Sequence, residues 1–127
     1  MRNLIISFAI LLVMIITWSV FFNHASDSFK ALSDEITTET VAAVEKEDWK
    51  GAMDSFDKIK DKWKKYHTTS MFFLENEEII EVDLCIAKSH EYISAHDVSN
   101  SAGELKYLSK QLSIMAEKEE LSWHNIL

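Results

Sequence analysis

Apolar and polar positions divide this chain into two parts. Residues Leu4 to Phe22 form an uncharged run, LIISFAILLVMIITWSVFF. As a helix rising about 1.5 Å per residue, the run spans about 28 Å, which is close to the hydrocarbon thickness of a bilayer. Beyond it, apolar residues recur at steps of three and four, the spacing of helices with one buried face. The pattern predicts a cytoplasmic stub at 1–3, a transmembrane anchor at 4–22 and a helical domain at 23–127.

The flanks of the apolar run decide between an anchor and a cleaved signal peptide. A signal peptide has a shorter apolar stretch and a cleavage site of small residues, and residues 23–26 (NHAS) match such a site poorly. Arg2 precedes the run, and Asp27 is the first charge after it. Because positive flanks stay in the cytoplasm, the sequence predicts a single-pass signal anchor in the cell membrane, with the N-terminus inside and the C-terminal domain outside.

The domain is expected to start as a continuation of the membrane helix. Nothing between Asn23 and Ser28 forces a break, so one rod is predicted to run to about Glu45. Its inward positions are Phe29, Leu32, Ile36, Thr40 and Ala43. Asp48 is suited to cap a second helix, because its carboxylate can accept from the backbone amides of the first turn. The inward face of that helix comprises Trp49, Ala52, Met53, Phe56, Ile59, Trp63 and Tyr66, and residues 67–70 are predicted to end it.

Two further helices follow. The third is predicted over Met71–His96, with inward residues Ile79, Val82, Ile86, His90 and Ile93. After a polar turn at 97–100, Ser101 and Glu104 have the spacing of a capping box, in which each side chain bonds the other's backbone amide. The fourth helix has Leu105, Leu108, Leu112 and Met115 on one face.

The composition limits the fold to helices. The chain has no proline and two glycines, whereas strand-rich folds need turn residues at frequent intervals. Four helices joined by short turns alternate in direction. The predicted fold is therefore all-α, with an N-terminal transmembrane helix followed by an antiparallel bundle of about four helices. Two stacked helical hairpins, which leave a groove for a peptide or a partner helix, are the alternative.

Charge and cysteine content exclude several classes of function. The formal net charge is −8, so the domain has no electrostatic reason to bind nucleic acid. Cys85 is the only cysteine, and its apolar neighbours predict a buried small side chain rather than a reactive thiol. The chain contains neither a glycine-rich phosphate loop nor a haem-attachment sequence. No cofactor is expected.

Four residues are candidates for interaction or for polar positions in the core: Trp49, Trp63, Asp83 and His90. Asp83 and His90 lie on the predicted inward side of the third helix, but two turns, about 10.5 Å, separate them, so they cannot bond each other. A metal site in a bundle needs several converging carboxylate and histidine ligands. Glu120 and His124, four apart, fit a solvated face better than such a site. The prediction is that the domain holds no metal and performs no catalysis.

The chain as a whole resembles the domain-of-unknown-function family numbered 4363. The resemblance is carried by the N-terminal run, Asp48-Trp49-x-x-Ala52, Trp63, Ile80-x-x-Asp83 and, after a glutamate-rich helix, Asn125-Ile126-Leu127. It implies a short, helical, single-pass membrane protein of Gram-positive bacteria. It also implies an accessory role, because such proteins are often encoded beside polytopic membrane proteins. No activity and no catalytic residues come with the resemblance.

Two functions are consistent with these observations, and neither is enzymatic. The first is a membrane-anchored interaction module, accessory to another membrane or envelope protein. It would bind the bilayer through 4–22 and a polytopic membrane protein through its domain, or a second copy of itself. The second is an extracytoplasmic bundle that binds or senses a small molecule, since bundles enclose ligands between their helices. A sensor needs a cytoplasmic output, and only residues 1–3 precede the run, which favours the accessory role.

Overall fold

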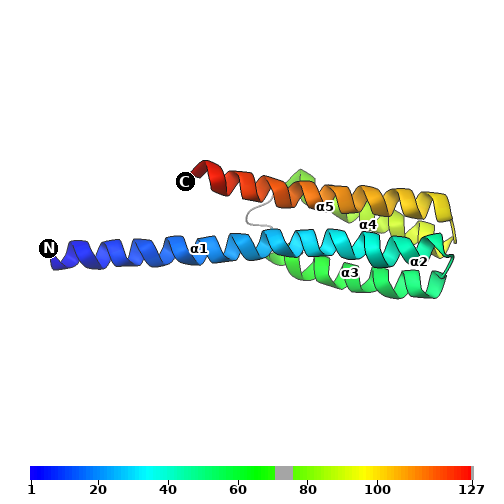
Figure 1. Cartoon of the computed structure of the whole chain (residues 1–127), viewed down its shortest axis with the longest axis horizontal. Coiled ribbons are helices and arrows are strands. Elements are labelled where there is room, and N and C mark those ends of the chain that lie inside the picture. The colour runs from blue at the N-terminus through cyan, green and yellow to red at the C-terminus, as the bar shows by residue number, and fades with distance from the viewer. Residues whose placement is uncertain (71–75, 127) are drawn as a thin grey trace.

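One continuous helical rod leads from the apolar run into the domain. Helix α1 (Arg2–Glu35), a π-helical segment η1 (Ile36–Val41) and helix α2 (Ala42–Glu45) follow one another without a break. The rod predicted to reach about Glu45 is therefore confirmed. Among the described residues, Arg2–Phe21 is the stretch that is long and apolar enough to cross a membrane, and none of it is buried. Figure 1 shows this part of α1 projecting from the bundle.

Three more helices complete the domain. The computed structural model describes residues 1–70 and 76–126, and for residues 22, 23, 25, 26, 69, 70 and 119–126 it describes the backbone alone. The helices are α3 (Trp49–Ser70), α4 (Asn76–Ser94) and α5 (Val98–Ile126). Helix α3 therefore continues through the end predicted at 67–70, and the third helix ends at Ser94 rather than His96. Its predicted start at Met71 lies outside the described residues.

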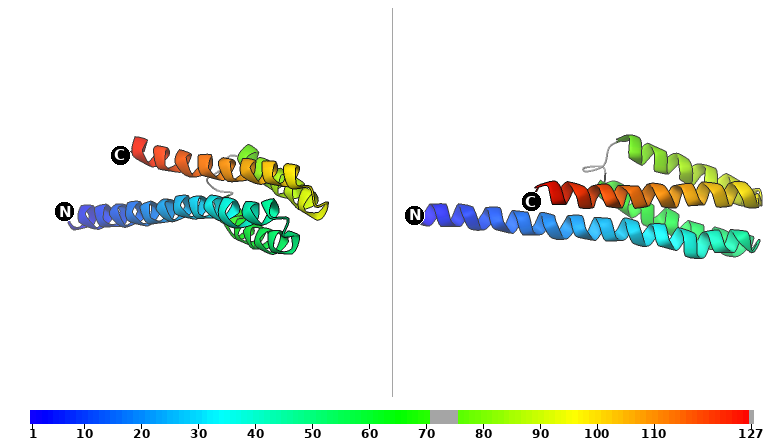
Figure 2. Two further views of the ribbon diagram at one scale, coloured as in Figure 1. Left: turned by 45° about the vertical axis from the view of Figure 1, so that its right-hand side comes forward. Right: turned by 45° about the horizontal axis from the view of Figure 1, so that its top comes forward.

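The helices form an antiparallel bundle with one core. Helices α1 and α4 each pack on both α3 and α5, so α3 and α5 occupy opposite corners. Figure 2 shows the two hairpins of this arrangement lying side by side, the rod with α3 and α4 with α5. The predicted all-α fold, an N-terminal apolar helix followed by a helical bundle, is confirmed. The buried core contains most of the predicted inward residues: Phe29, Leu32, Ile36, Ala52, Phe56, Ile59, Trp63, Ile79, Val82, Ile86, Ile93, Leu105, Leu108, Leu112 and Met115.

The π-helical segment changes the face that the rod turns to the core. A π-helical turn contains an extra residue and so rotates the residues that follow it. Val41 and Val44 are buried as a result, whereas the predicted inward residue Ala43 is partly buried and packs against the core. Within the segment, the hydroxyl of Thr40 is hydrogen-bonded to that of Ser55 on α3, at 2.6 Å. This bond satisfies two buried polar groups.

Two buried serines join α1 to α5. The Ser33 hydroxyl donates to the carbonyl oxygen of Ser109 at 2.8 Å, and the Ser109 hydroxyl donates to that of Ser33 at 3.0 Å. Both side chains are small, so the two backbones approach closely enough to exchange these bonds. Because hydroxyls buried without a partner destabilise the fold, the reciprocal pairing also favours one register between the helices.

The first hairpin turn is built as the sequence predicts. Glu47 adopts a left-handed conformation, with φ 58°. Its amide donates to the carbonyl of Val44 at 2.9 Å, and the amide of Asp48 donates to that of Ala43 at 2.9 Å, which closes the helix end. The Asp48 carboxylate then accepts from the amide of Gly51 at 3.1 Å. Asp48 is therefore the N-cap of α3, as predicted.

The second hairpin turn corrects a prediction. His96 is left-handed, with φ 55°, and the Asp97 carboxylate accepts from the amide of Asn100 at 3.1 Å. Asp97 therefore caps α5, and the proposed capping box of Ser101 and Glu104 is wrong. Ser101 lies inside the helix, where its amide bonds the carbonyl of Asp97 at 3.0 Å. The spacing of Ser101 and Glu104 fits a capping box, but the carboxylate of Asp97, four residues before Ser101, caps the helix instead.

Candidate functional site

Two of the four candidate residues meet in the structure. Trp63 is 3% exposed, and its indole Nε1 donates to Asp83 Oδ1 at 2.8 Å, which links α3 to α4. His67 Nε2 lies 3.6 Å from the other oxygen of Asp83. The Asp83 side chain is nevertheless 50% exposed, so its predicted inward position is wrong. The polar edge of the buried indole reaches the bundle surface and bonds the carboxylate there.

The other two candidates lie apart from this pair. The half-buried ring of Trp49 stacks on His96, with centroids 4.8 Å apart and planes at 1°. The His90 side chain is 41% exposed, and its Nδ1 lies 3.7 Å from the Glu91 carboxylate. His90 is therefore not the buried core histidine that the spacing predicted. The buried face of α4 contains Ser89, the residue before His90, instead.

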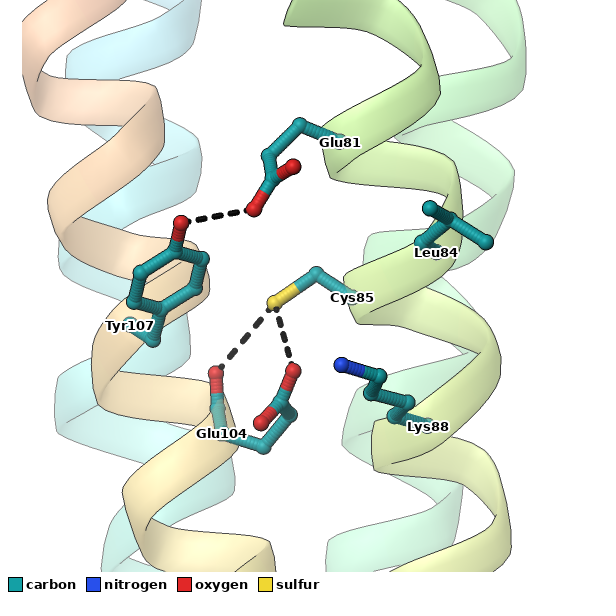
Figure 3. A pocket seen from close by; sticks show the side chains of 6 residues that line it. All are labelled: Glu81, Leu84, Cys85, Lys88, Glu104 and Tyr107. Carbon is teal, nitrogen blue, oxygen red and sulfur yellow. Dashed lines mark hydrogen bonds between the residues drawn. The ribbon is translucent and has the colours of Figure 1, made fainter.

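A shallow pocket of about 260 Å³ lies between α4 and α5. Its lining residues are Glu81, Leu84, Cys85, Lys88, Glu104 and Tyr107. The Tyr107 hydroxyl donates to Glu81 Oε1 at 2.6 Å across the gap between the helices. Figure 3 shows this pair at one end of the pocket, Glu104 and Lys88 at the other, and Cys85 between them.

The cysteine in the pocket is held in its protonated form. The Cys85 Sγ lies 3.3 Å from the Glu104 carboxylate and 3.5 Å from its backbone oxygen, and the thiol donates to both. Burial, followed by the hydrogen bond to Glu104, raises the pKa of the Cys85 thiol from 9.0 to about 12. The reactive thiolate is therefore scarce at neutral pH. Cys85 packs as a small buried side chain, as predicted.

Exposed apolar side chains flank the pocket. Outside the apolar run, the exposed large apolar residues of the described domain are Ile80, Leu84, Tyr107 and Ile114. Ile80 and Leu84 are 56% and 54% exposed and stand one turn apart on α4. We call Ile80 and Leu84 the α4 face. The sequence contained a signal for it, because both residues are apolar yet fall outside the inward stripe of this helix.

The described side chains do not converge as metal ligands. Among the residues that the structure describes, no group of three or more His, Cys, Asp and Glu is placed to hold a metal ion. In the pocket, Glu81 and Glu104 already accept hydrogen bonds from Tyr107 and Cys85. The side chains of Glu120 and His124, the other pair of possible metal ligands, lie outside the described residues.

Comparisons with known proteins give one match. The family model described as domain of unknown function (DUF4363) matches residues 17–126, which include the end of the apolar run and almost the whole domain. This match confirms the resemblance found in the sequence. No curated protein and no solved structure matches the chain.

Proposed function

This chain belongs to the family of the domain of unknown function DUF4363, and we propose that it is a membrane-anchored helical interaction module. Its role would be accessory to another membrane or envelope protein. The observation that carries the proposal is the α4 face, Ile80 and Leu84, with Tyr107 across the pocket. Single exposed apolar residues are normal, but neighbouring ones beside a concave, polar-rimmed surface are typical of interaction sites.

The α4 face stands close to the apolar run. Asp83, between the two residues of the face, is bonded to Trp63, whose ring lies 6.3 Å from that of Phe29. Phe29 follows Phe22 by two helical turns, about 10 Å. If residues 4–22 span a bilayer, the α4 face lies just above its surface. The extramembrane part of a polytopic neighbour would be within reach.

The continuous rod supports docking in a fixed orientation. Helix α1, η1 and α2 connect the apolar run to the bundle as one continuous helical rod. The anchor would therefore hold the α4 face at a set height and direction relative to the membrane. Arg2 before the run favours a cytoplasmic N-terminus and an extracytoplasmic domain. Less conformational freedom is then lost when a partner in the same membrane binds.

A small-molecule-binding or sensory bundle is the second candidate. The pocket between α4 and α5 favours it, but at about 260 Å³ it is near the lower limit of pockets that bind drug-sized ligands. A ligand there would contact Lys88 and Glu104, which line the pocket, whereas Ile80 lies outside it. Substitutions at Ile80 and Lys88 therefore separate the two functions. Neither proposal includes a catalytic step.

Site-specific cross-linking in membranes tests the leading proposal. A photo-reactive residue at Leu84 should give a discrete cross-linked product, and the same residue at Asp54, exposed on α3, should give none. A product of twice the mass would identify a second copy as the partner. Equal labelling from both positions, or none from either, would argue against a specific surface at the α4 face.

Two further measurements complete the test. Replacing Ile80 and Leu84 together with serine should abolish the cross-linked complex and leave thermal unfolding unchanged, because both side chains are largely exposed. For the topology, a reporter that is active only after export should work when fused after Leu127, and a cytoplasmic reporter should not. The reverse result would place the domain in the cytoplasm.

A further inference from the structure

The basic residues of this acidic chain are concentrated in one helix. The formal net charge is −8, with 13 basic residues in the whole chain. Five of them lie within eight consecutive positions of α3: Lys58, Lys60, Lys62, Lys64 and Lys65. The same stretch contains a single acidic residue, Asp61. A local concentration of lysines on a net acidic protein requires a local explanation.

This stretch lies in the half of α3 that returns toward the apolar run. The ring of Phe29 on α1 lies 6.3 Å from that of Trp63 and 6.1 Å from that of Tyr66. Lys64 and Lys65, between these two aromatic residues, are therefore level with Phe29, about 10 Å beyond Phe22. Figure 1 shows α3 ending beside α1, while α5 continues further along α1.

That height lies just above the headgroup region of a bilayer. Headgroups extend roughly 5 to 7 Å beyond the hydrocarbon on each side, and charges interact over roughly 8 Å at physiological ionic strength. A lysine side chain is long enough to lower its ammonium group toward the phosphates while its stem stays on the helix. The ammonium groups of Lys64 and Lys65 are thus within range of the membrane surface.

The lysines of the stretch differ in their partners. Lys62 is bound to Glu35, and Lys60 lies 4.0 Å from Asp57. Lys64 and Lys65 are exposed, and within the described part of the chain neither forms an ion pair. Their charges are therefore not neutralised inside the protein.

Anionic headgroups would attract the corner of the bundle that α3 occupies. This attraction would tilt the bundle toward α3.

We infer that Lys64 and Lys65 bind the anionic phospholipid headgroups of the membrane that holds residues 4–22. This inference rests on the membrane anchorage proposed above. It adds a second contact with the same bilayer and fixes which corner of the bundle lies lower. The α4 face would then meet its partner in one orientation only.

Spin labelling of the full chain in vesicles tests the inference. A nitroxide is attached at Thr68→Cys, near the membrane end of α3, in a Cys85→Ala background. Its accessibility to lipid-soluble and aqueous relaxation agents reports its depth. In vesicles containing about 30 mol % phosphatidylglycerol, the label should shift toward the lipid phase relative to pure phosphatidylcholine. About 1 M salt should reverse the shift.

Charge-reversal variants provide the control. Lys64→Glu with Lys65→Glu should abolish the shift. Lys50→Glu with Lys106→Glu makes the same change in net charge at the far end of the bundle, where Lys106 pairs with Glu45 at 3.4 Å, and it should leave the shift intact.

The possible failures are distinguishable. If the protein stays in the vesicles but the label has the same depth in both lipids, this inference alone is overturned. The lysines would then be available to bind an acidic protein partner. Equal effects of the two charge-reversal variants overturn it as well, because they show a response to net charge only. Protein that washes off the vesicles overturns the anchorage itself.

Discussion

Glu47 and His96 have the same left-handed backbone conformation, with φ 58° and 55°, and each ends the first helix of a hairpin. Each is followed by an aspartate, Asp48 or Asp97, that caps the next helix through its carboxylate. The two turns lie together at the end of the bundle away from the apolar run, because Trp49 stacks on His96. One turn design, used twice, therefore closes both hairpins.

The first prediction follows from the strain at Glu47. A residue with a Cβ in the left-handed region is disfavoured, and glycine is the usual residue at this position after a helix. Glu47→Gly should therefore raise the free energy of unfolding by about 0.5 to 1 kcal/mol, measured by thermal unfolding of the full chain in detergent. Lys46→Gly is the matched control. Lys46 has φ −85°, so glycine there should destabilise the protein, and stabilisation by both variants would refute the argument.

The second prediction compares the two glycines. A Cβ at Gly103 would meet nothing within 4 Å, so Gly103→Ala should stabilise α5 by about 1 kcal/mol through helix propensity. A Cβ at Gly51 would clash with the carboxylate of Asp48. Gly51→Ala must displace that cap, so its gain in propensity should be largely cancelled. Unfolding curves that show equal stabilisation would mean that the cap contributes little.

The third prediction concerns the link between Trp63 and Asp83. Trp63→Ala should lower the free energy of unfolding by about 3 to 5 kcal/mol, because the ring is buried. The hydrogen bond itself is isolated by a double-mutant cycle of Trp63→Phe and Asp83→Ala, with an expected coupling of about 0.5 to 1.5 kcal/mol. Additive effects would show that the bond contributes nothing measurable. Unchanged stability of Trp63→Ala would contradict the burial of the ring.

The fourth prediction concerns the thiol of Cys85. Its pKa is raised from 9.0 to about 12 in the folded protein, so the folded state retains a proton that the unfolded state releases above pH 9. The contribution of the thiol to stability should be constant below pH 9 and fall as the pH rises from about 9 to about 12. The difference in the free energy of unfolding between the native chain and Cys85→Ala measures the contribution of the thiol. Tyrosines and lysines titrate in both proteins, so their effects cancel in this difference.

Thiol labelling gives an independent measurement of the same feature. At pH 8 an aromatic disulfide reagent should modify Cys85 slowly in the folded chain and rapidly in denaturant. Rapid modification of the folded chain would show that the thiol is neither buried nor held by Glu104.

The sequence by itself determined the features that depend on one helix at a time. The apolar run, the rod to about Glu45, the inward faces and the Asp48 cap follow from spacing and from side-chain chemistry within one or two turns. These interactions are local, so a single segment contains the information. The family resemblance, carried by the same local patterns, was confirmed by the match over residues 17–126.

Only the tertiary structure decided how those helices face one another. Spacing predicted Asp83 and His90 on the inward side of their helix, but packing of the bundle leaves both side chains partly exposed, with Asp83 bonded to Trp63. The same holds for the reciprocal bonds of Ser33 and Ser109, residues far apart in sequence. Ile80 and Leu84 form a candidate surface because the packed bundle leaves both side chains exposed. Pairing between helices depends on packing of the whole bundle, which no local pattern specifies.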